Sequence, residues 1–197
     1  MKKTYLLIIL LGFIVNISEA QEYSYGLQVG TNFSSLLTDR DVIFNENGSF
    51  TIPEYAGFNV GVFGEYQFNE QFGLVTNLLY SNRGFDTSPN ITVSSLSLNP
   101  NLKFDVNKSY GKGFYLKAGL IYSFILDGKS DTQDLSDTLK NSVFGATLGA
   151  GIDFSDIFAL ELLFDYAFTD LFDTNEKSKI FGANLLLSIH IQSLIEK

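Results

Sequence analysis

The sequence predicts an all-β chain whose eight antiparallel strands close into an up-and-down barrel. Three observations support this fold class. The 197-residue chain is rich in Phe, Tyr and Gly but holds only three prolines, a composition that suits β structure. Apolar and polar residues alternate along eight segments after residue 20, which is the period of a strand. The connections between these segments alternate between long and short, as expected for consecutive antiparallel strands.

The first twenty residues are expected to be a leader and not part of the fold. Two lysines form a basic start, residues 5–17 are a short apolar run, and Ala20 is a small residue at its end. This pattern is typical of a secretory signal peptide that is cleaved after Ala20. An uncleaved anchor helix is less favoured, because a membrane span needs about 20 apolar residues. We therefore expect residues 1–20 to be removed and residues 21–197 to form one barrel domain.

The first four segments each have one apolar face, opposite a face of small or polar residues. The segments are 22–32 with Tyr23, Tyr25, Leu27 and Val29; 56–68 with Phe58, Val60 and Val62; 72–84 with Leu74, Leu78 and Tyr80; and 91–106 with Leu96, Leu98, Leu102 and Phe104. In the fourth segment Pro100 also stands on the apolar face. Since proline lacks an N–H and a closed barrel has no edge strand, we expect an irregular hydrogen-bond ladder near Pro100.

The last four segments repeat this alternation. They are 114–126 with Leu116, Ala118 and Leu120; 142–154 with Phe144, Leu148 and Ile152; 157–169 with Leu160, Leu162 and Phe164; and 179–191 with Phe181, Leu185, Leu187 and Ile189. Long connections follow the odd-numbered strands and short ones follow the second, fourth and sixth strands. An even number of strands places both ends of the barrel on the short-turn side, which is the periplasmic side of an outer-membrane barrel.

Alternation alone does not decide whether the apolar face lies inside or outside. A soluble lipocalin-like binder of an apolar ligand would turn it inward, whereas a membrane barrel turns it toward lipid. The polar face consists mainly of Gly, Ser, Asn and Thr, which suit the inside of a narrow barrel. Aromatic residues also gather at both ends of the strands, where membrane interfaces are expected. The sequence therefore predicts an eight-stranded antiparallel up-and-down transmembrane β-barrel in the cell outer membrane, in contact with lipid.

The aromatic residues form two predicted girdles. The short-turn girdle contains Tyr23, Tyr25, Phe68, Phe72, Phe104, Phe114, Phe154 and Phe158. The long-loop girdle contains Tyr80, Phe124, Phe144, Tyr166, Phe168 and Phe181.

Composition excludes several classes of function. The chain has no Cys and a single His, so disulfides and thiolate metal sites are impossible. The formal net charge of −9 argues against a nucleic-acid partner, because an acidic chain repels phosphates. We expect no cofactor and no metal.

A few charged residues fall on the inward face. Counting residues across the turns places Lys103 opposite Lys117, and Lys117 level with Gly151 and then Glu161. Because unpaired charges are costly in a low-dielectric lumen, we predict an internal ion-pair network of Glu65, Lys103, Lys117 and Glu161. It would either stabilise the barrel as a plug, which we favour, or gate a path for ions or protons.

Two further patterns are candidate sites. His190 shares a face with Ser188, and Asp153 could lie nearby, which are the residue types of nucleophilic catalysis; a histidine at the barrel rim is the favoured interpretation, and we predict no enzyme activity. The loop at 127–138 carries Asp127, Asp131, Asp134 and Asp137. It could bind a hard cation, but its spacing is not that of an EF-hand, and a solvated acidic loop is favoured.

Several motifs resemble those of one family. With the signal peptide, "YSYGLQVGTNFSSL", "LLYSNRGF", "LNPNLKF" and "FGATLGAGIDF" resemble the PorT-type small outer-membrane β-barrel proteins of Bacteroidetes, over nearly all of the mature chain. The resemblance implies an eight-stranded outer-membrane barrel; a few members are linked to protein secretion and most have no assigned role. One departure is the ending "SIHIQSLIEK", because such barrels usually end on an aromatic residue that the assembly machinery recognises.

The function predicted from the sequence is that of a monomeric outer-membrane barrel without catalytic activity. Its extracellular loops or its periplasmic rim would engage a protein partner, with an association with secretion as one possibility. A narrow barrel that conducts ions or a solute is the alternative.

Overall fold

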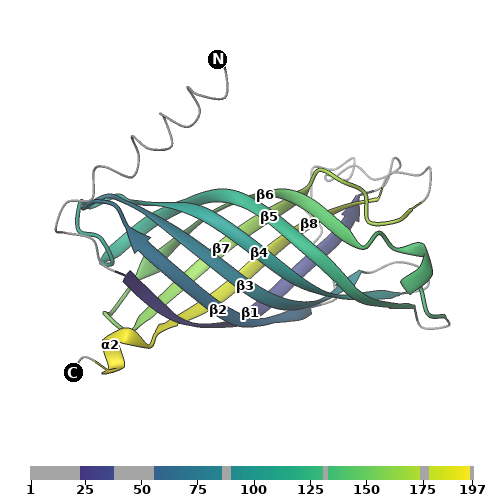
Figure 1. Ribbon diagram of the computed structural model, residues 1–197, viewed down its shortest axis with the longest axis horizontal. Coiled ribbons are helices and arrows are strands. Elements are labelled where there is room, and N and C mark those ends of the chain that lie inside the picture. Colours follow the sequence, from purple (N-terminus) through teal and green to yellow (C-terminus); the bar gives the residue numbers. More distant parts are fainter. Residues whose placement is uncertain (1–22, 38–55, 86–89, 131–132, 174–177, 196–197) are drawn as a thin grey trace, which may run out of the picture.

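The computed structural model describes residues 23–37, 56–85, 90–130, 133–173 and 178–195. The predicted signal peptide and its cleavage after Ala20 therefore lie outside the described residues. Eight strands follow one another along the chain (Figure 1). They are β1 (Tyr23–Leu37), β2 (Ala56–Gln67), β3 (Phe72–Phe85), β4 (Ile91–Asp105), β5 (Gly113–Ser130), β6 (Ser142–Asp153), β7 (Phe158–Ala167) and β8 (Lys179–His190).

Each strand pairs antiparallel with the next, and β1 pairs with β8 to close the barrel. Across this closing seam Leu27 lies opposite Ile189, and Leu37 lies opposite Lys179. Closure leaves no strand with a free row of backbone N–H and C=O groups. The predicted fold class is therefore confirmed. Strands that are far apart in the sequence now face one another across the lumen.

The strands end close to their predicted positions at the short turns and differ most at the long loops. β1 continues to Leu37 and β5 to Ser130, beyond the predicted ends at residues 32 and 126. Both extensions are paired, since Leu37 lies opposite Lys179 and Ser130 lies opposite Ile91. The polar residues in these extensions interrupt the alternation, which is why the sequence pattern ended the strands too early.

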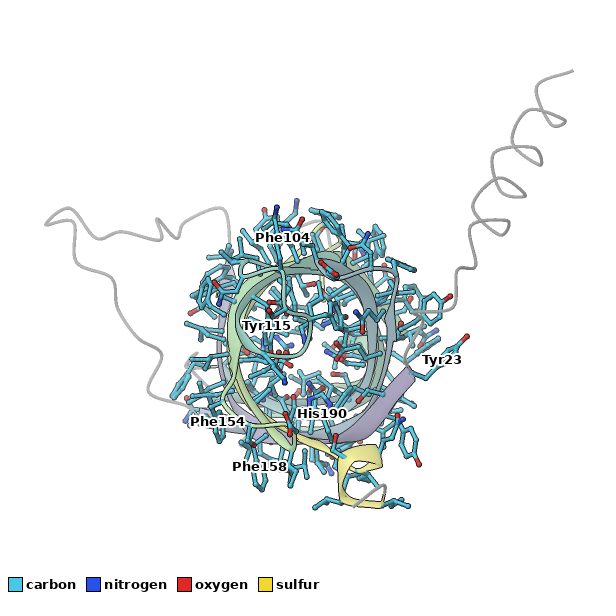
Figure 2. All side chains as sticks on the ribbon, turned by 90° about the vertical axis from the view of Figure 1, so that its left-hand side faces the viewer. Tyr23, Phe104, Tyr115, Phe154, Phe158 and His190 are labelled. Atoms are coloured by element: carbon cyan, nitrogen blue, oxygen red, sulfur yellow. The ribbon has the colours of Figure 1, made fainter. Side chains whose placement is uncertain are left out.

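On every strand most of the exposed side chains are apolar and most of the polar ones face inward, although some apolar residues such as Leu79, Leu163 and Leu186 are also buried in the lumen. Leu102 is 48% exposed, whereas its neighbour Lys103 is 2% exposed. Figure 2 looks along the barrel and shows Tyr115 inside the ring of strands, with Phe104, Phe154 and Phe158 outside it. A soluble barrel that binds an apolar ligand would show the reverse. The lipocalin-like alternative is therefore wrong, and the outer face is that of a membrane barrel.

Pro100 lies where the ladder between β4 and β5 is interrupted. Leu98 pairs with Tyr122 and Asn101 pairs with Gly119, but within these fully described strands no pairing joins Asn99 or Pro100 to β5. On the other side of β4, Pro100 pairs with Thr76 of β3. The prediction of an irregular ladder is confirmed, and the irregularity faces β5. A separate β-bulge shifts the register between Ser94 and Ser95.

The predicted aromatic girdles form contacts around both rims. At the short-turn end, the ring centroids of Tyr23 and Tyr66 lie 4.8 Å apart and those of Phe72 and Phe104 5.1 Å apart. At the long-loop end, Phe144 and Phe168 lie 5.7 Å apart. Such pairs brace neighbouring strands at the level of the lipid headgroups.

Two short helical turns complete the described chain. The 3-10 turn η1 (Ser136–Thr138) lies in the loop after β5, and α2 (Gln192–Ile195) follows β8. Neither these turns nor any other described helix has the length and apolar character needed to cross a membrane.

Candidate functional site

The candidate site is the lumen, which side chains fill in successive layers from the short-turn end to the long-loop end. The first layer surrounds Lys103 of β4. Its Nζ lies 3.0 Å from Oε1 of Glu65 on β2 and 3.0 Å from Oδ2 of Asp153 on β6. One ammonium thus joins three strands that are not neighbours in the sheet, and all three side chains are buried.

Two aromatic rings complete the surroundings of Lys103. Its Nζ lies 4.2 Å from the ring centroid of Tyr115 and 4.9 Å from that of Tyr110, which are distances of cation–π contacts. Tyr110 comes from the turn between β4 and β5, where Lys108, Gly111 and Gly113 have positive φ angles. Burial and the nearby Glu65 carboxylate raise the pKa of Tyr110, so its hydroxyl keeps its proton. This turn thus brings an aromatic ring to the short-turn mouth of the lumen.

The second layer joins Lys117 of β5 to Glu161 of β7. Lys117 Nζ lies 2.7 Å from Glu161 Oε2. The other carboxylate oxygen of Glu161 accepts hydrogen bonds from Ser188 Oγ at 3.0 Å and from Gln28 Nε2 at 3.3 Å. The buried carboxylate therefore has partners on both oxygens, as a charge in a low-dielectric lumen requires.

The four residues of the predicted network are buried in the lumen but form two clusters. Glu65 contacts Lys103, and Lys117 contacts Glu161. The register used for the prediction was wrong by two residues, because Lys117 lies opposite Gly149 and not Gly151. Gly151 instead lies opposite Tyr115, and a Cβ there would collide with the Tyr115 ring.

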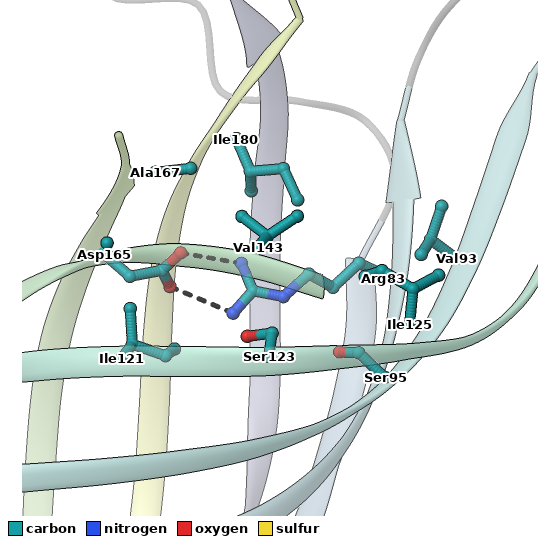
Figure 3. Close-up of a pocket in the computed structure, with 11 residues that line it drawn as sticks. Arg83, Val93, Ser95, Ile121, Ser123, Ile125, Val143, Asp165, Ala167 and Ile180 are labelled. Carbon is teal, nitrogen blue, oxygen red and sulfur yellow. Dashed lines mark hydrogen bonds and ion pairs between the residues drawn. The ribbon is translucent and has the colours of Figure 1, made fainter. Parts of the chain in front are cut away.

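A third ion pair lies closer to the long-loop end and was not part of the predicted network. Arg83 Nη1 and Nη2 donate to the two carboxylate oxygens of Asp165 at 2.9 and 3.1 Å (Figure 3). Asn184 Nδ2 donates to the same carboxylate at 2.6 Å. The alternation marks Arg83 and Asp165 as inward-facing, but β3 and β7 are not adjacent, so no strand register could pair them.

Above this ion pair the lumen is closed by an apolar lid. Its buried residues are Phe85, Val93, Leu139, Val143, Ala167, Leu171 and Ile180. Leu139 and Leu171 come from the long connections, and the backbone is tied by a hydrogen bond from Lys140 N to Leu171 O at 2.8 Å. The loop bases therefore fold over the mouth of the barrel and exclude water from it.

Cavities in the upper half of the lumen are small. One, of about 20 Å³, lies between the Arg83–Asp165 pair and the apolar lid, and another, of about 10 Å³, lies just below the pair. Each is about the space of one water molecule. A larger cavity of about 260 Å³ opens at the short-turn mouth, where Ser24, Glu65, Tyr110 and His190 are among its lining residues.

His190 does not hold Ser188 as a nucleophile. Ser188 Oγ donates to Glu161, while His190 Nδ1 lies 2.8 Å from Ser24 Oγ. His190 Nε2 is 4.0 Å from Asp153, whose carboxylate is already paired with Lys103. The three residues considered from the sequence are therefore not arranged as a triad.

The acidic loop does not gather its carboxylates. Asp127 pairs with Lys129 at 2.7 Å, and Asp134 accepts hydrogen bonds from the hydroxyl and amide of Ser136. These bonds lower the pKa of Asp134. Among the residues that the structure describes, no group of three His, Cys, Asp or Glu could hold a metal ion; Asp131 lies outside them.

Comparisons with known proteins agree with this architecture. A family model described as "Outer membrane protein beta-barrel domain" matches residues 18–173. The structure of Ail, the attachment invasion locus protein of Yersinia pestis, in complex with the heparin analogue sucrose octasulfate, has a TM-score of 0.51 and 18% identity, and the match covers 86% of this chain and 99% of Ail. Neisserial surface protein A has a TM-score of 0.54 and 13% identity, with 87% and 99% covered. No curated protein matches the chain. At these identities the two structures show a shared fold.

Proposed function

The chain belongs to the outer membrane protein β-barrel domain family, and from this premise we propose that it is a closed, non-catalytic barrel that presents partner-binding segments at the membrane surface. The observation that carries the proposal is the filling of the lumen. Three groups of buried ion pairs and an apolar lid fill the lumen. Such a lumen serves as the rigid interior of an anchor.

A narrow conducting barrel is the second candidate, because charged residues line the lumen. A hydrated ion would have to break the Lys117–Glu161 and Arg83–Asp165 pairs and then cross the apolar lid. Breaking a buried pair costs about 3–5 kcal/mol. The two cavities described in the upper lumen, of about 10 and 20 Å³, each offer about the space of one water molecule. These observations favour the closed barrel.

The long-loop end has the features of a partner-binding platform. β1 and β5 continue to Leu37 and Ser130, paired with β8 and β4, and Leu139 and Phe172 form a bridge between two loop bases. These paired segments would hold exposed loop residues in place, so that a partner need not order them on binding.

Charge indicates what kind of partner these loops would accept. In the loop segments after β5 and β7, the described acidic residues Asp134, Asp137, Asp170 and Asp173 outnumber Lys140. The Ail structure holds a heparin analogue, which is a polyanion. A surface with this acidic excess would repel a polyanion, so we propose a protein partner without strong negative charge.

An association with protein secretion would shift the partner to the periplasmic rim. This role rests on the resemblance to PorT-type barrels, some of which are linked to secretion. We propose the barrel itself to be a monomer, because its closed sheet leaves no edge for strand pairing with a second copy.

Site-specific photo-crosslinking in living cells tests this function. A photoreactive amino acid would replace Asp137 in the loop after β5 or Glu70 in the turn after β2, both of which are exposed. Lipid-facing Leu98 serves as the matched control. We expect a discrete protein adduct from one rim position and none from Leu98. Absence of a protein adduct at both rims would contradict the partner-binding role.

A further inference from the structure

The α2 turn follows β8 directly and lies outside the barrel wall at the short-turn end (Figures 1 and 2). Its position is fixed by backbone hydrogen bonds. Ile191 N donates to Tyr25 O of β1 at 3.0 Å, and Leu194 N donates to Ile191 O at 3.0 Å. The segment is therefore tied to the closing seam of the barrel and is not a loose tail.

At the short-turn end, β8 carries no outward aromatic residue. Each of the first seven strands carries an outward aromatic residue at or next to this end, and these are Tyr23, Tyr66, Phe72, Phe104, Phe114, Phe154 and Phe158. On β8 the corresponding outward positions hold Leu187 and Ile189. The girdle therefore has a gap where the chain leaves the sheet.

The two halves of α2 have different surroundings. Gln192 and Ser193 are half-buried and line the cavity of about 260 Å³ at the short-turn mouth. Leu194 and Ile195 are 53% and 70% exposed. Two exposed branched aliphatic side chains are unfavourable in water, and here they belong to a segment that is tied to Tyr25 of β1, an exposed residue of the short-turn girdle.

We propose that α2 is an interfacial foot that inserts Leu194 and Ile195 into the membrane leaflet at the short-turn end, in place of the aromatic residue that β8 lacks. The occupant of this apolar face is lipid, because α2 is tied to Tyr25 at the end of the lipid-facing surface of the barrel and lies outside the barrel wall (Figure 2). The polar residues Gln192 and Ser193 remain in the aqueous mouth. A short segment with one apolar and one polar side suits this depth, as interfacial amphipathic segments do.

The composition of the chain permits a direct test, since it contains neither Trp nor Cys. In Leu194→Trp the indole is the only tryptophan of the protein. Glu70→Trp, in the exposed turn between β2 and β3, is the aqueous control, and Leu98→Trp, on the outer face of β4, is the lipid control. Each variant would be reconstituted in phosphatidylcholine vesicles with and without bromine atoms on the acyl chains.

We expect the emission of Leu194→Trp to lie to the blue of that of Glu70→Trp and to be quenched by lipids brominated close to the headgroup. Leu98→Trp should be quenched best by bromines deeper in the chain. The proposal would be overturned if the emission of Leu194→Trp were as red as that of Glu70→Trp and as little quenched by the brominated lipids. An α2 that is covered by a protein partner in the cell would also give this result, because the vesicles contain no partner.

A second probe guards against a variant that fails to fold. Ile195→Cys, which carries the only thiol, would bear a nitroxide spin label, and heat-modifiable gel migration would first verify that each barrel is folded. We expect the label to collide more with oxygen than with a water-soluble nickel complex. Greater collision with the nickel complex would contradict insertion.

Discussion

Lys103 places one ammonium among two carboxylates and two aromatic rings, at 2% exposure. In such a setting the ion pairs of Lys103 contribute only modestly to the net stability of the fold, because the cost of desolvating the charges offsets much of their attraction. Removing one member is different, since it leaves the remaining charges buried without a partner. The contribution of Lys103 to stability is therefore best measured by substituting this lysine.

The change Lys103→Met should lower the free energy of unfolding by about 3–5 kcal/mol. It leaves Glu65 and Asp153 buried without their cation. Denaturant unfolding of the barrel in lipid vesicles would measure the difference. The matched control is Lys129→Met, which removes a lysine–carboxylate pair of 2.7 Å that is exposed to solvent and should change little. Equal effects of the two changes would contradict a buried ion-pair layer.

Gly151 provides the space in which the ring of Tyr115 packs. The change Gly151→Ala should lower the free energy of unfolding by about 1–3 kcal/mol, because Tyr115 is buried and cannot move aside. Gly64→Ala is the control, since a Cβ at Gly64 meets no atom within 4 Å. Thermal unfolding followed by circular dichroism would compare them. A loss at Gly64 as large as at Gly151 would show that the effect is not one of packing.

The alternation of residues along each strand identified the charged side chains that face inward, but it could not predict which of them form ion pairs. Glu65 and Lys103 stand on β2 and β4, with β3 between them, so their contact crosses the lumen and leaves no trace in the local pattern. The register error between Lys117 and Gly151 has a related cause. The long connection between β5 and β6 does not fix a register, whereas the short turn between β6 and β7 correctly placed Gly151 opposite Glu161.

Among the elements, β4 shows how a closed sheet accommodates a proline. The ladder loses its pairing toward β5 at Asn99 and Pro100 but continues on both sides in the same register. Local alternation was sufficient to predict all eight strands, and the missing N–H of Pro100 was sufficient to predict this interruption. It was not sufficient for the ends of β1 and β5, where pairing with the opposite strand overrides the polar sequence.

The change Pro100→Ala should restore a ladder hydrogen bond. The new amide at position 100 would face β5 near Leu120, and its hydrogen exchange should be as slow as that of Leu102 in the same strand. Exchange measured by NMR in detergent micelles or nanodiscs provides the test, with Leu98→Ala as a control that adds no N–H. Rapid hydrogen exchange at position 100 would show that the β4–β5 ladder is interrupted for a reason other than the backbone N–H that Pro100 lacks.

For the whole molecule, the arrangement of layers explains why a polar lumen is closed. Lys103, Lys117 and Arg83 each form a separate buried ion pair, and Leu171 belongs to the apolar lid at the long-loop end. The sequence predicted the polar lumen from the alternation of small and apolar residues. It did not predict the lid, because Leu139 and Leu171 belong to the long connections, where no periodic pattern assigns a residue to the inside.

The conductance of the purified wild-type barrel in planar lipid bilayers tests the closed lumen most directly. The folded barrel, verified by heat-modifiable migration, would be inserted at neutral pH in 1 M KCl, with an open porin as the positive control. The predicted result is insertion without discrete conductance steps over the voltage range in which the porin conducts. Reproducible steps from the wild-type barrel, abolished by its removal, would contradict a closed lumen and favour the conducting alternative.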